Sequence, residues 1–186
     1  KRINQLLEKS IETNQFTNYG PNVQLLEKKI KNKLEIINNK AVIAVSNGSV
    51  ALQALTKSIV FYHNKNINWA TQSFTFPSSA QGTLSRTKII DIDKEGGIDL
   101  NKITDDIDGS IITNIFGNVV NIDKYIKWGN KNNKFIVFDN AATPCSYYKG
   151  INSCNYGNGS IISFHHTKPI GFGEGGAIIV DKIYEK

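Results

Sequence analysis

The chain has 186 residues, a formal net charge of +6, two Cys and no Met, and 40% of its residues are hydrophobic. This length and apolar content suit one folded domain and exclude a disordered chain. No apolar run approaches the roughly 18 residues of a membrane span, and the lysines are not clustered with aromatics as nucleic-acid binding would require.

Helical and extended patterns alternate along the chain. Apolar residues recur every three or four positions over residues 22–37, which predicts a helix with one buried stripe. In chain order, helices are predicted at residues 3–11, 22–37, 52–59, 77–84 and 122–128. Strands are predicted at seven β-rich runs, residues 41–45, 68–71, 88–92, 110–115, 135–138, 160–164 and 177–180.

The strand runs are continuously apolar, which is typical of strands buried on both faces. We therefore predict an α/β fold in three layers, α/β/α, around a mostly parallel seven-stranded sheet. Residues 1–40 form an N-terminal helical segment in this interpretation, and residues 41–186 form the large domain. Ligands of such sheets bind at the carboxyl ends of the strands, so we look for the site there.

The first candidate for a site is Ser46-Asn47-Gly48-Ser49, which joins an apolar strand to a helix. A helix start offers free N–H groups and the positive end of a dipole, which suit a phosphate group. Gly48 lets an anion approach the backbone, and the Ser49 hydroxyl adds a donor. The alternative is an ordinary capped turn, because Ser and Asn are good N-cap residues.

Asp139 and Lys168 are the second and third candidates. Asp139 directly follows the strand at 135–138, where a carboxylate can hold a cationic ring nitrogen. Lys168 follows the strand at 160–164, where a lysine of lowered pKa can form a Schiff base with a carbonyl compound. Taken singly, each residue is better explained as a turn or helix-cap Asp or as a surface Lys.

Three other patterns do not predict a site. Gly171-Phe-Gly-Glu-Gly-Gly176 matches G-x-G-x-x-G but precedes a strand, so we expect a turn between strands and no dinucleotide site. His165 and His166 are adjacent and should face opposite ways on an extended chain, which argues against a metal site. Cys145 and Cys154 have neither zinc nor disulfide spacing and are expected to be reduced thiols.

The order of the three candidates is more informative than any one of them. A phosphate-type loop comes first, then a carboxylate at a strand end, then a lysine. Pyridoxal phosphate (PLP) needs this set, because it has a phosphate, a ring nitrogen and an aldehyde. The sequence therefore favours PLP as cofactor and predicts no metal.

Several segments match the motifs of one family in order. They are Tyr19-Gly-Pro-Asn-Val23, Val45-Ser-Asn-Gly-Ser-Val-Ala-Leu52, Gln72-Ser-Phe-Thr-Phe-Pro77, Phe138-Asp-Asn-Ala-Ala142, Ser163-Phe-His-His-Thr-Lys168 and Gly173-Glu-Gly-Gly176. On these residues the chain resembles the DegT/DnrJ/EryC1/StrS family of PLP-dependent sugar aminotransferases, which have the fold type I, aspartate aminotransferase-like fold. Two positions depart from the family pattern. Thr143 follows the two alanines, where Gln, His or Glu is common, and Asn114 stands where His is common.

The resemblance implies a transaminase that moves an amino group, usually from glutamate, onto a nucleotide-linked keto-deoxysugar for surface-glycan or deoxyaminosugar biosynthesis. Lys168 and Asp139 would be catalytic, with Lys168 holding the aldehyde and Asp139 the ring nitrogen. Phe76 would stack on the ring, and Gly48, Ser49 and Ser163 would hold the phosphate. Relatives that act as sugar dehydratases have His in place of this lysine, so Lys168 favours transamination.

The resemblance also implies that the intact protein is a homodimer. The scattered lysines and short apolar runs argue against nucleic-acid and membrane partners, and two reduced thiols are the expectation for a cytoplasmic protein. Because the chain begins with Lys1 and has no Met, we expect a fragment. The resemblance implies that this fragment lacks the C-terminal small domain, and we expect it to be only feebly active alone. Three alternatives remain open: a fold type I enzyme acting on an amino acid, a non-catalytic or regulatory relative that binds PLP or a sugar nucleotide, and an α/β domain without a cofactor.

Overall fold

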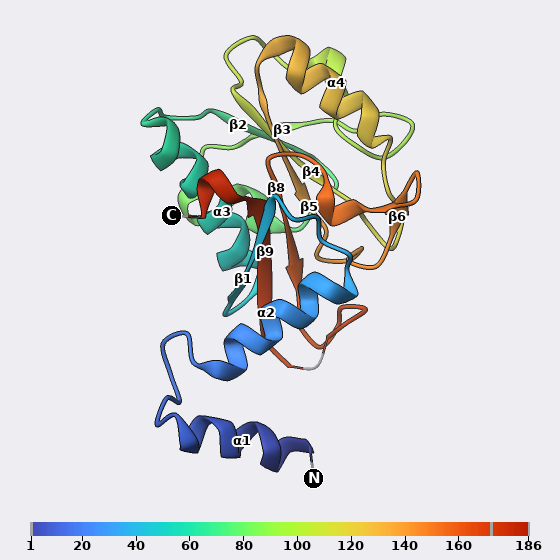
Figure 1. The fold of residues 1–186 in the computed structure, drawn as a ribbon. Coiled ribbons are helices and arrows are strands. Elements are labelled where there is room, and N and C mark those ends of the chain that lie inside the picture. The colour runs from blue at the N-terminus through green and yellow to red at the C-terminus, as the bar shows by residue number, and fades with distance from the viewer. Residues whose placement is uncertain (1, 172, 186) are drawn as a thin grey trace.

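The computed structural model describes residues 2–171 and 173–185, and its centre is a seven-stranded sheet (Figure 1). The strand order is β1-β9-β8-β5-β4-β2-β3. Their bounds are Lys40–Val45 for β1, Trp69–Gln72 for β2, Lys88–Ile90 for β3, Gly109–Thr113 for β4, Phe135–Asp139 for β5, Gly159–Ser163 for β8 and Gly176–Asp181 for β9.

Strand β9 is antiparallel to both of its neighbours, β1 and β8, and the other neighbouring pairs are parallel. The sheet is therefore mostly parallel, as the continuous apolar runs predict. The connection between β8 and β9 contains the glycine-rich segment at 171–176, of which Phe172 lies outside the described residues. It joins two antiparallel strands, so the expected turn between strands is confirmed and no helix follows these glycines.

Helices cover both faces of the sheet and complete the three predicted layers (Figure 1). The helices are α1 (Arg2–Glu12), α2 (Pro21–Lys33), α3 (Gly48–His63) and α4 (Ile122–Asn132). Alternate residues of one strand face opposite helices, since Val137 packs in a core with α3 residues while Ile136 and Phe138 pack in a core with α4 residues. Helix α2 lies on the same side as α4, against Ile162 and Ile179.

Two local predictions differ from the structure. Helix α2 ends at Lys33 and not at residue 37, because Glu35 has a positive φ of 52°, yet Ile36 is still buried. The predicted helix at 77–84 consists of two 3-10 helices, Pro77–Ala80 and Gly82–Leu84. The sequence analysis also missed a small hairpin, β6 (Tyr147–Tyr148) and β7 (Ile151–Asn152).

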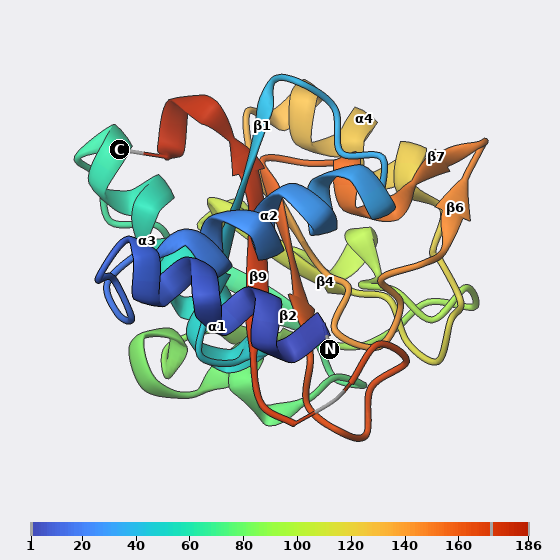
Figure 2. The same cartoon turned by 60° about the horizontal axis from the view of Figure 1, so that its bottom comes forward.

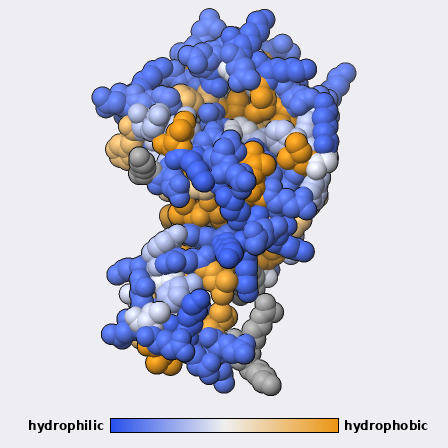
Figure 3. Space-filling model, in the orientation of Figure 1, coloured by the Kyte–Doolittle hydropathy of each residue, from blue (hydrophilic) through white to orange (hydrophobic). Residues whose placement is uncertain are grey.

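Helix α2 lies beside the edge strand β1, and α1 packs on α2, away from the sheet (Figure 1). Glu27 of α2 is buried and accepts hydrogen bonds from the Ala44 N–H and from the Tyr19 hydroxyl, both at 2.9 Å. The Glu27 carboxylate thereby pairs the Ala44 N–H on the outer side of the edge strand β1. Unpaired backbone groups at such an edge favour pairing with another chain. Helix α1 exposes apolar side chains such as Leu7, and the surface in Figure 3 is otherwise mostly hydrophilic. The domain division at residue 40 stays a prediction.

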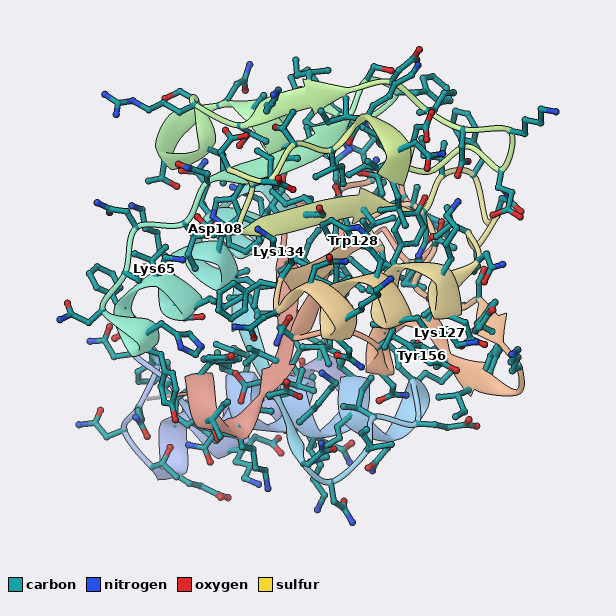
Figure 4. The ribbon with its side chains drawn as sticks, turned by 90° about the horizontal axis from the view of Figure 1, so that it is seen from above. Lys65, Asp108, Lys127, Trp128, Lys134 and Tyr156 are labelled. Carbon is teal, nitrogen blue, oxygen red and sulfur yellow. The ribbon has the colours of Figure 1, made fainter. Side chains whose placement is uncertain are left out.

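Charged residues join the elements at the amino ends of the parallel strands, which Figure 4 shows from above. The Nζ of Lys65, just after α3, lies 2.7 Å from Oδ1 of Asp108, and Oδ2 of Asp108 accepts from the Asn68 N–H at 3.0 Å. These contacts join the residues before β2 and β4 to the end of α3. Over the described residues, no helix combines the length and apolar character needed to cross a membrane.

Candidate active site

The carboxyl ends of the strands surround a cavity of about 370 Å³, at the edge of the sheet that Figure 2 turns toward the viewer. The six residues predicted to hold a cofactor all line it: Gly48, Ser49, Phe76, Asp139, Ser163 and Lys168. They lie at the ends of strands β1, β2, β5 and β8 or in the segments that follow them. Folding thus brings the predicted set together, in the place where parallel sheets bind ligands.

The first wall of the cavity is the start of helix α3. Asn47 is its N-cap, and the Asn47 side chain accepts from the Val50 N–H at 2.8 Å. The N–H groups of Gly48 and Ser49 have no acceptor within the helix, because they belong to its first turn. A Cβ on Gly48 would lie 3.0 Å from the Ser163 Cβ, so the absence of a side chain brings this turn against β8. The loop is a capped turn and also offers free donors to an anion.

The second wall is Asp139, the last residue of β5, whose exposed fraction is 2%. Its Oδ1 accepts from the Ala141 N–H at 2.9 Å. Burial raises the pKa of the Asp139 carboxyl, and the Ala141 N–H and the charge of Lys168 oppose that rise. A buried carboxyl in this state gains most from a cation bound beside it, such as a protonated ring nitrogen.

Lys168 and Phe76 face each other across the cavity. The Lys168 Nζ lies 5.8 Å from the centre of the Phe76 ring, which is 62% exposed. Among the described residues no carboxylate forms an ion pair with Lys168. A tight turn holds the lysine, since the Lys168 N–H donates to the His165 carbonyl at 2.8 Å and the Gly171 N–H donates to the Lys168 carbonyl at the same distance. The amine is thus partly exposed and available for chemistry.

A second cavity of about 210 Å³ adjoins the first, and Phe76, Asp139, Ala141 and Lys168 line both. Its further walls are mostly apolar, namely Phe74, Thr75, Thr113, Ile115, Phe116 and Ala142. The two cavities together form a continuous site that extends from the start of α3, past Lys168, to the loop after β4.

The sequence analysis missed Gln72, which is fully buried at the end of β2. Its Nε2 donates to the carbonyls of Phe74, Gly96 and Thr113, at 3.0, 3.0 and 3.2 Å, and its Oε1 accepts from the Thr113 N–H at 2.9 Å. This side chain fixes the segment that carries Phe76. The available signal was an amide side chain at the end of a short strand, directly before the segment that carries Phe76.

Thr143 and Asn114, the two departures from the family pattern, are both buried. The Thr143 hydroxyl donates to the Asn114 carbonyl at 2.8 Å, and the Asn114 side chain donates to the Asn140 side-chain oxygen at 2.7 Å. Neither residue lines the two cavities. They join the loops that follow β4 and β5.

The histidines are arranged differently from the prediction. The rings of His165 and His166 have their centres 4.1 Å apart, so the expectation that they face opposite ways is wrong. The cause is the turn at 165–168, which replaces an extended chain. Cys145 and Cys154 are both free thiols, and no cluster of metal-binding side chains occurs among the described residues.

This sheet, with a helix start, a carboxylate and a lysine at its carboxyl edge, defines the large domain of fold type I PLP-dependent transferases. The chain belongs to the DegT/DnrJ/EryC1/StrS aminotransferase family, whose model matches residues 1–184. The family implies pyridoxal phosphate as the cofactor.

Solved structures agree with this fold. DesI, solved in the presence of its TDP-sugar product, has a TM-score of 0.81 and 20% identity, and the match covers 98% of this chain and 47% of that chain. E. coli GDP-4-keto-6-deoxy-D-mannose-3-dehydratase, solved with bound hydrated PLP, has a TM-score of 0.81 and 19% identity, with 97% and 49% covered. Aminotransferases and dehydratases thus share this architecture.

Proteins with similar sequences agree with the family assignment. A UDP-4-amino-4,6-dideoxy-N-acetyl-beta-L-altrosamine transaminase from Campylobacter jejuni is 31% identical over 119 residues, which cover 59% of this chain and 32% of that protein. Curated relatives from Mycobacterium are 30% identical over 183 residues and 90% of this chain. The chain spans 43% of the length of these mycobacterial relatives.

Proposed function

We propose that this chain carries the cofactor site of an aminotransferase that moves an amino group from glutamate onto a nucleotide-linked keto-deoxysugar. The observation that carries the proposal is the cavity shared by Lys168, Asp139 and the start of α3. It combines an amine, a buried carboxyl and free N–H donors within one cavity. The two larger cavities, at the amino ends of the strands, do not have this set among their described residues.

The residues present fit PLP. The N–H groups of Gly48 and Ser49, with the hydroxyls of Ser49 and Ser163, form an anion site whose close approach depends on Gly48. Asp139 would hold the ring nitrogen, and Phe76 would stack on the ring. Lys168 would hold the aldehyde. When bound, PLP supplies an aldehyde that accepts amines and a ring that withdraws electrons.

The protein groups then have separate tasks. Asp139, ionised beside a cation, keeps the proton on the ring nitrogen, because burial strengthens their attraction. The Lys168 amine accepts and returns the proton of the reacting carbon, for which its flexible chain and partly exposed position are suited. The Ala141 N–H holds one oxygen of Asp139 in place at 2.9 Å.

We prefer transamination to dehydration because the residue at position 168 is Lys and not His. A primary amine can both bond the aldehyde and move a proton, whereas an imidazole can only move the proton. The similarity to a transaminase from Campylobacter jejuni supports the same choice. We further propose that the intact protein is a cytoplasmic homodimer that serves surface-glycan or deoxyaminosugar biosynthesis, as the family resemblance implies.

The test begins with covalent attachment. The intact protein is incubated with PLP, reduced with borohydride and digested, and peptide mass spectrometry locates the cofactor. We expect the label on Lys168, and its loss in Lys168→Ala. Lys127→Ala, an exposed lysine of α4 visible in Figure 4, is the matched control and should label normally.

The second step measures amino transfer. Glutamate added to the PLP-loaded protein should yield 2-oxoglutarate, and a nucleotide-linked 4-keto-6-deoxysugar should then receive the amino group. Labelling of Lys168 without either transfer would support the non-catalytic alternative. Release of water from the sugar without a requirement for glutamate would support a dehydratase, and transfer only to a keto acid would support an amino-acid transaminase.

A further inference from the structure

Phe116 has an unusual backbone conformation for an aromatic residue. Its φ is +54° and that of Gly117 is +83°, and the Asn118 N–H donates to the Ile115 carbonyl at 2.9 Å. Positive φ at both central residues is the pattern of a type I′ turn, in which Gly and Asn are favoured. A side chain at this φ crowds the backbone, and such outliers concentrate at functional sites.

The Phe116 side chain does not compensate for that strain by packing inside the protein. It is 85% exposed, and its ring centre lies 6.3 Å from that of Phe74, which is also exposed. An exposed phenyl ring at positive φ gains little from the fold. Another part of the molecule therefore has to hold the turn.

A set of hydrogen bonds from the loop after β5 holds it. The Thr143 hydroxyl accepts from the Gly117 N–H at 3.3 Å while it donates to the Asn114 carbonyl at 2.8 Å. The Ser146 hydroxyl donates to the Gly117 carbonyl at 3.0 Å. Both polar groups of Gly117 are thus engaged. We call Thr143 and Ser146 the clasp of the Phe116 turn.

The clasp places Phe116 in the wall of the smaller cavity, which Lys168 and Asp139 also line. Among the described residues that line this cavity, Lys168 is the only cation and Asp139 the only anion. Most of the remaining wall is phenyl rings and aliphatic side chains. A ligand group that reacts at Lys168 and extends along this wall therefore meets an apolar surface.

That surface discriminates between the two substrates of the proposed reaction. The second carboxylate of glutamate needs a cation or several donors, which this wall does not supply. A deoxysugar ring presents C–H groups and a methyl group, which pack well on an aromatic face. We propose that Phe116, held by the Thr143–Ser146 clasp, is a specificity-determining residue that packs on the apolar face of the sugar ring. This inference rests on the proposed aminotransferase function.

The test compares binding of two probes to the intact protein by calorimetry, with and without PLP. One probe is a UDP-linked 4-amino-4,6-dideoxyhexose and the other is UDP. We expect Phe116→Ala to weaken binding of the sugar probe about tenfold and to leave UDP binding unchanged. Phe61→Ala, a 79% exposed phenylalanine of α3 outside both cavities, is the matched control and should alter neither.

The clasp is tested through Thr143. Thr143→Val keeps the shape but removes the hydroxyl, and should raise the KM for the keto sugar while the KM for glutamate and the absorbance of the PLP-loaded protein stay unchanged. Thr143→Ser restores the hydroxyl and should restore the sugar KM. If Thr143→Val does not fold, the binding of the two probes to Phe116→Ala tests the inference on its own. That variant should fold, because the Phe116 ring is exposed.

Four results would overturn the inference. The first is unchanged sugar-probe affinity in Phe116→Ala, and the second is an equal loss of UDP affinity in that variant. The third is absence of sugar-probe binding by the unaltered protein. The fourth is a lower mass of Phe116→Ala in light scattering with unchanged sugar affinity, which would make Phe116 a contact between copies. Labelling of Lys168 and formation of 2-oxoglutarate report on the proposed function separately. Failure of that function is thus distinguishable from failure of this inference.

Discussion

A Cβ atom on Gly48 would lie 3.0 Å from the Cβ of Ser163, so the start of α3 touches the end of β8. This contact brings the free N–H groups of the helix beside the Ser163 hydroxyl. We expect Gly48→Ala to lower the free energy of unfolding by about 1 kcal/mol through overpacking. It should also weaken PLP binding, because the turn has to move. Urea unfolding and a PLP titration measure the two effects.

A double variant separates crowding from chemistry. Adding Ser163→Gly to Gly48→Ala removes the opposing Cβ, but it also removes the acceptor of the His165 N–H and puts glycine in a strand. We therefore expect the free energy of unfolding to recover only in part, while PLP binding stays weak because a hydroxyl is lost. Unchanged stability and unchanged PLP affinity in Gly48→Ala alone would show that the two segments are not held in contact.

Asp139→Asn should stabilise the cofactor-free protein at neutral pH. Burial raises the pKa of the folded Asp139 carboxyl, so the folded state binds a proton more tightly than the unfolded state. Stability from this group is therefore complete below the ordinary Asp pKa of about 3.9 and is lost as pH rises through the raised value. Asn is neutral and keeps an oxygen for the Ala141 N–H, so it avoids that loss.

The measurement is the midpoint of urea unfolding against pH, from about pH 4 to about pH 8, across the Asp titration range. The difference between Asp139→Asn and the unaltered protein should widen with rising pH in the apo form. PLP should reverse the order, since only a carboxylate balances a protonated ring nitrogen. A constant difference across this pH range would mean that Asp139 titrates normally.

The positions of Asp139 and Lys168 were predictable because each follows an apolar strand, and parallel strands end at one edge of a sheet. The clasp between Thr143 and Gly117 was not, because it joins two loops whose relative path no periodic pattern encodes. Residues 34–37 show a related limit. Leu34 is buried as the helical stripe implies, but Ile37, the last residue of that stripe, is 43% exposed and Ile36 is buried in its place, because the helix ends at Lys33.

Gln72 should contribute strongly to stability through its hydrogen bonds. Its amide joins the carbonyls of Phe74, Gly96 and Thr113, and accepts from the Thr113 N–H. Gln72→Leu leaves these buried groups without partners, so we expect a loss of about 2 to 4 kcal/mol. Gln81→Ala, at an exposed glutamine nearby in sequence, is the control and should change unfolding by less than about 0.5 kcal/mol. Equal unfolding curves for both variants would contradict the prediction.

The two cysteines should differ sharply in reactivity. Burial raises the pKa of the Cys154 thiol to about 12, and the side chain is fully buried, whereas Cys145 is exposed. Only the thiolate reacts with alkylating agents, so the folded protein should take up one label, at Cys145. Labelling at Cys154 should appear only in denaturant. Mass spectrometry of the native protein reads this directly, and two labels at equal rates would contradict the buried position of Cys154.

Phe116→Gly gives the sharpest separation of stability from function. Glycine adopts positive φ freely, so the replacement removes a strain of about 1 kcal/mol, while an 85% exposed ring contributes little packing. We expect thermal unfolding at an equal or higher Tm, together with the weakened sugar binding of Phe116→Ala. Asn118→Gly, in the same turn but without a positive φ, is the control and should lower Tm slightly. A clear drop in Tm for Phe116→Gly would mean that the ring stabilises the fold itself, and that its conformation needs no explanation from ligand binding.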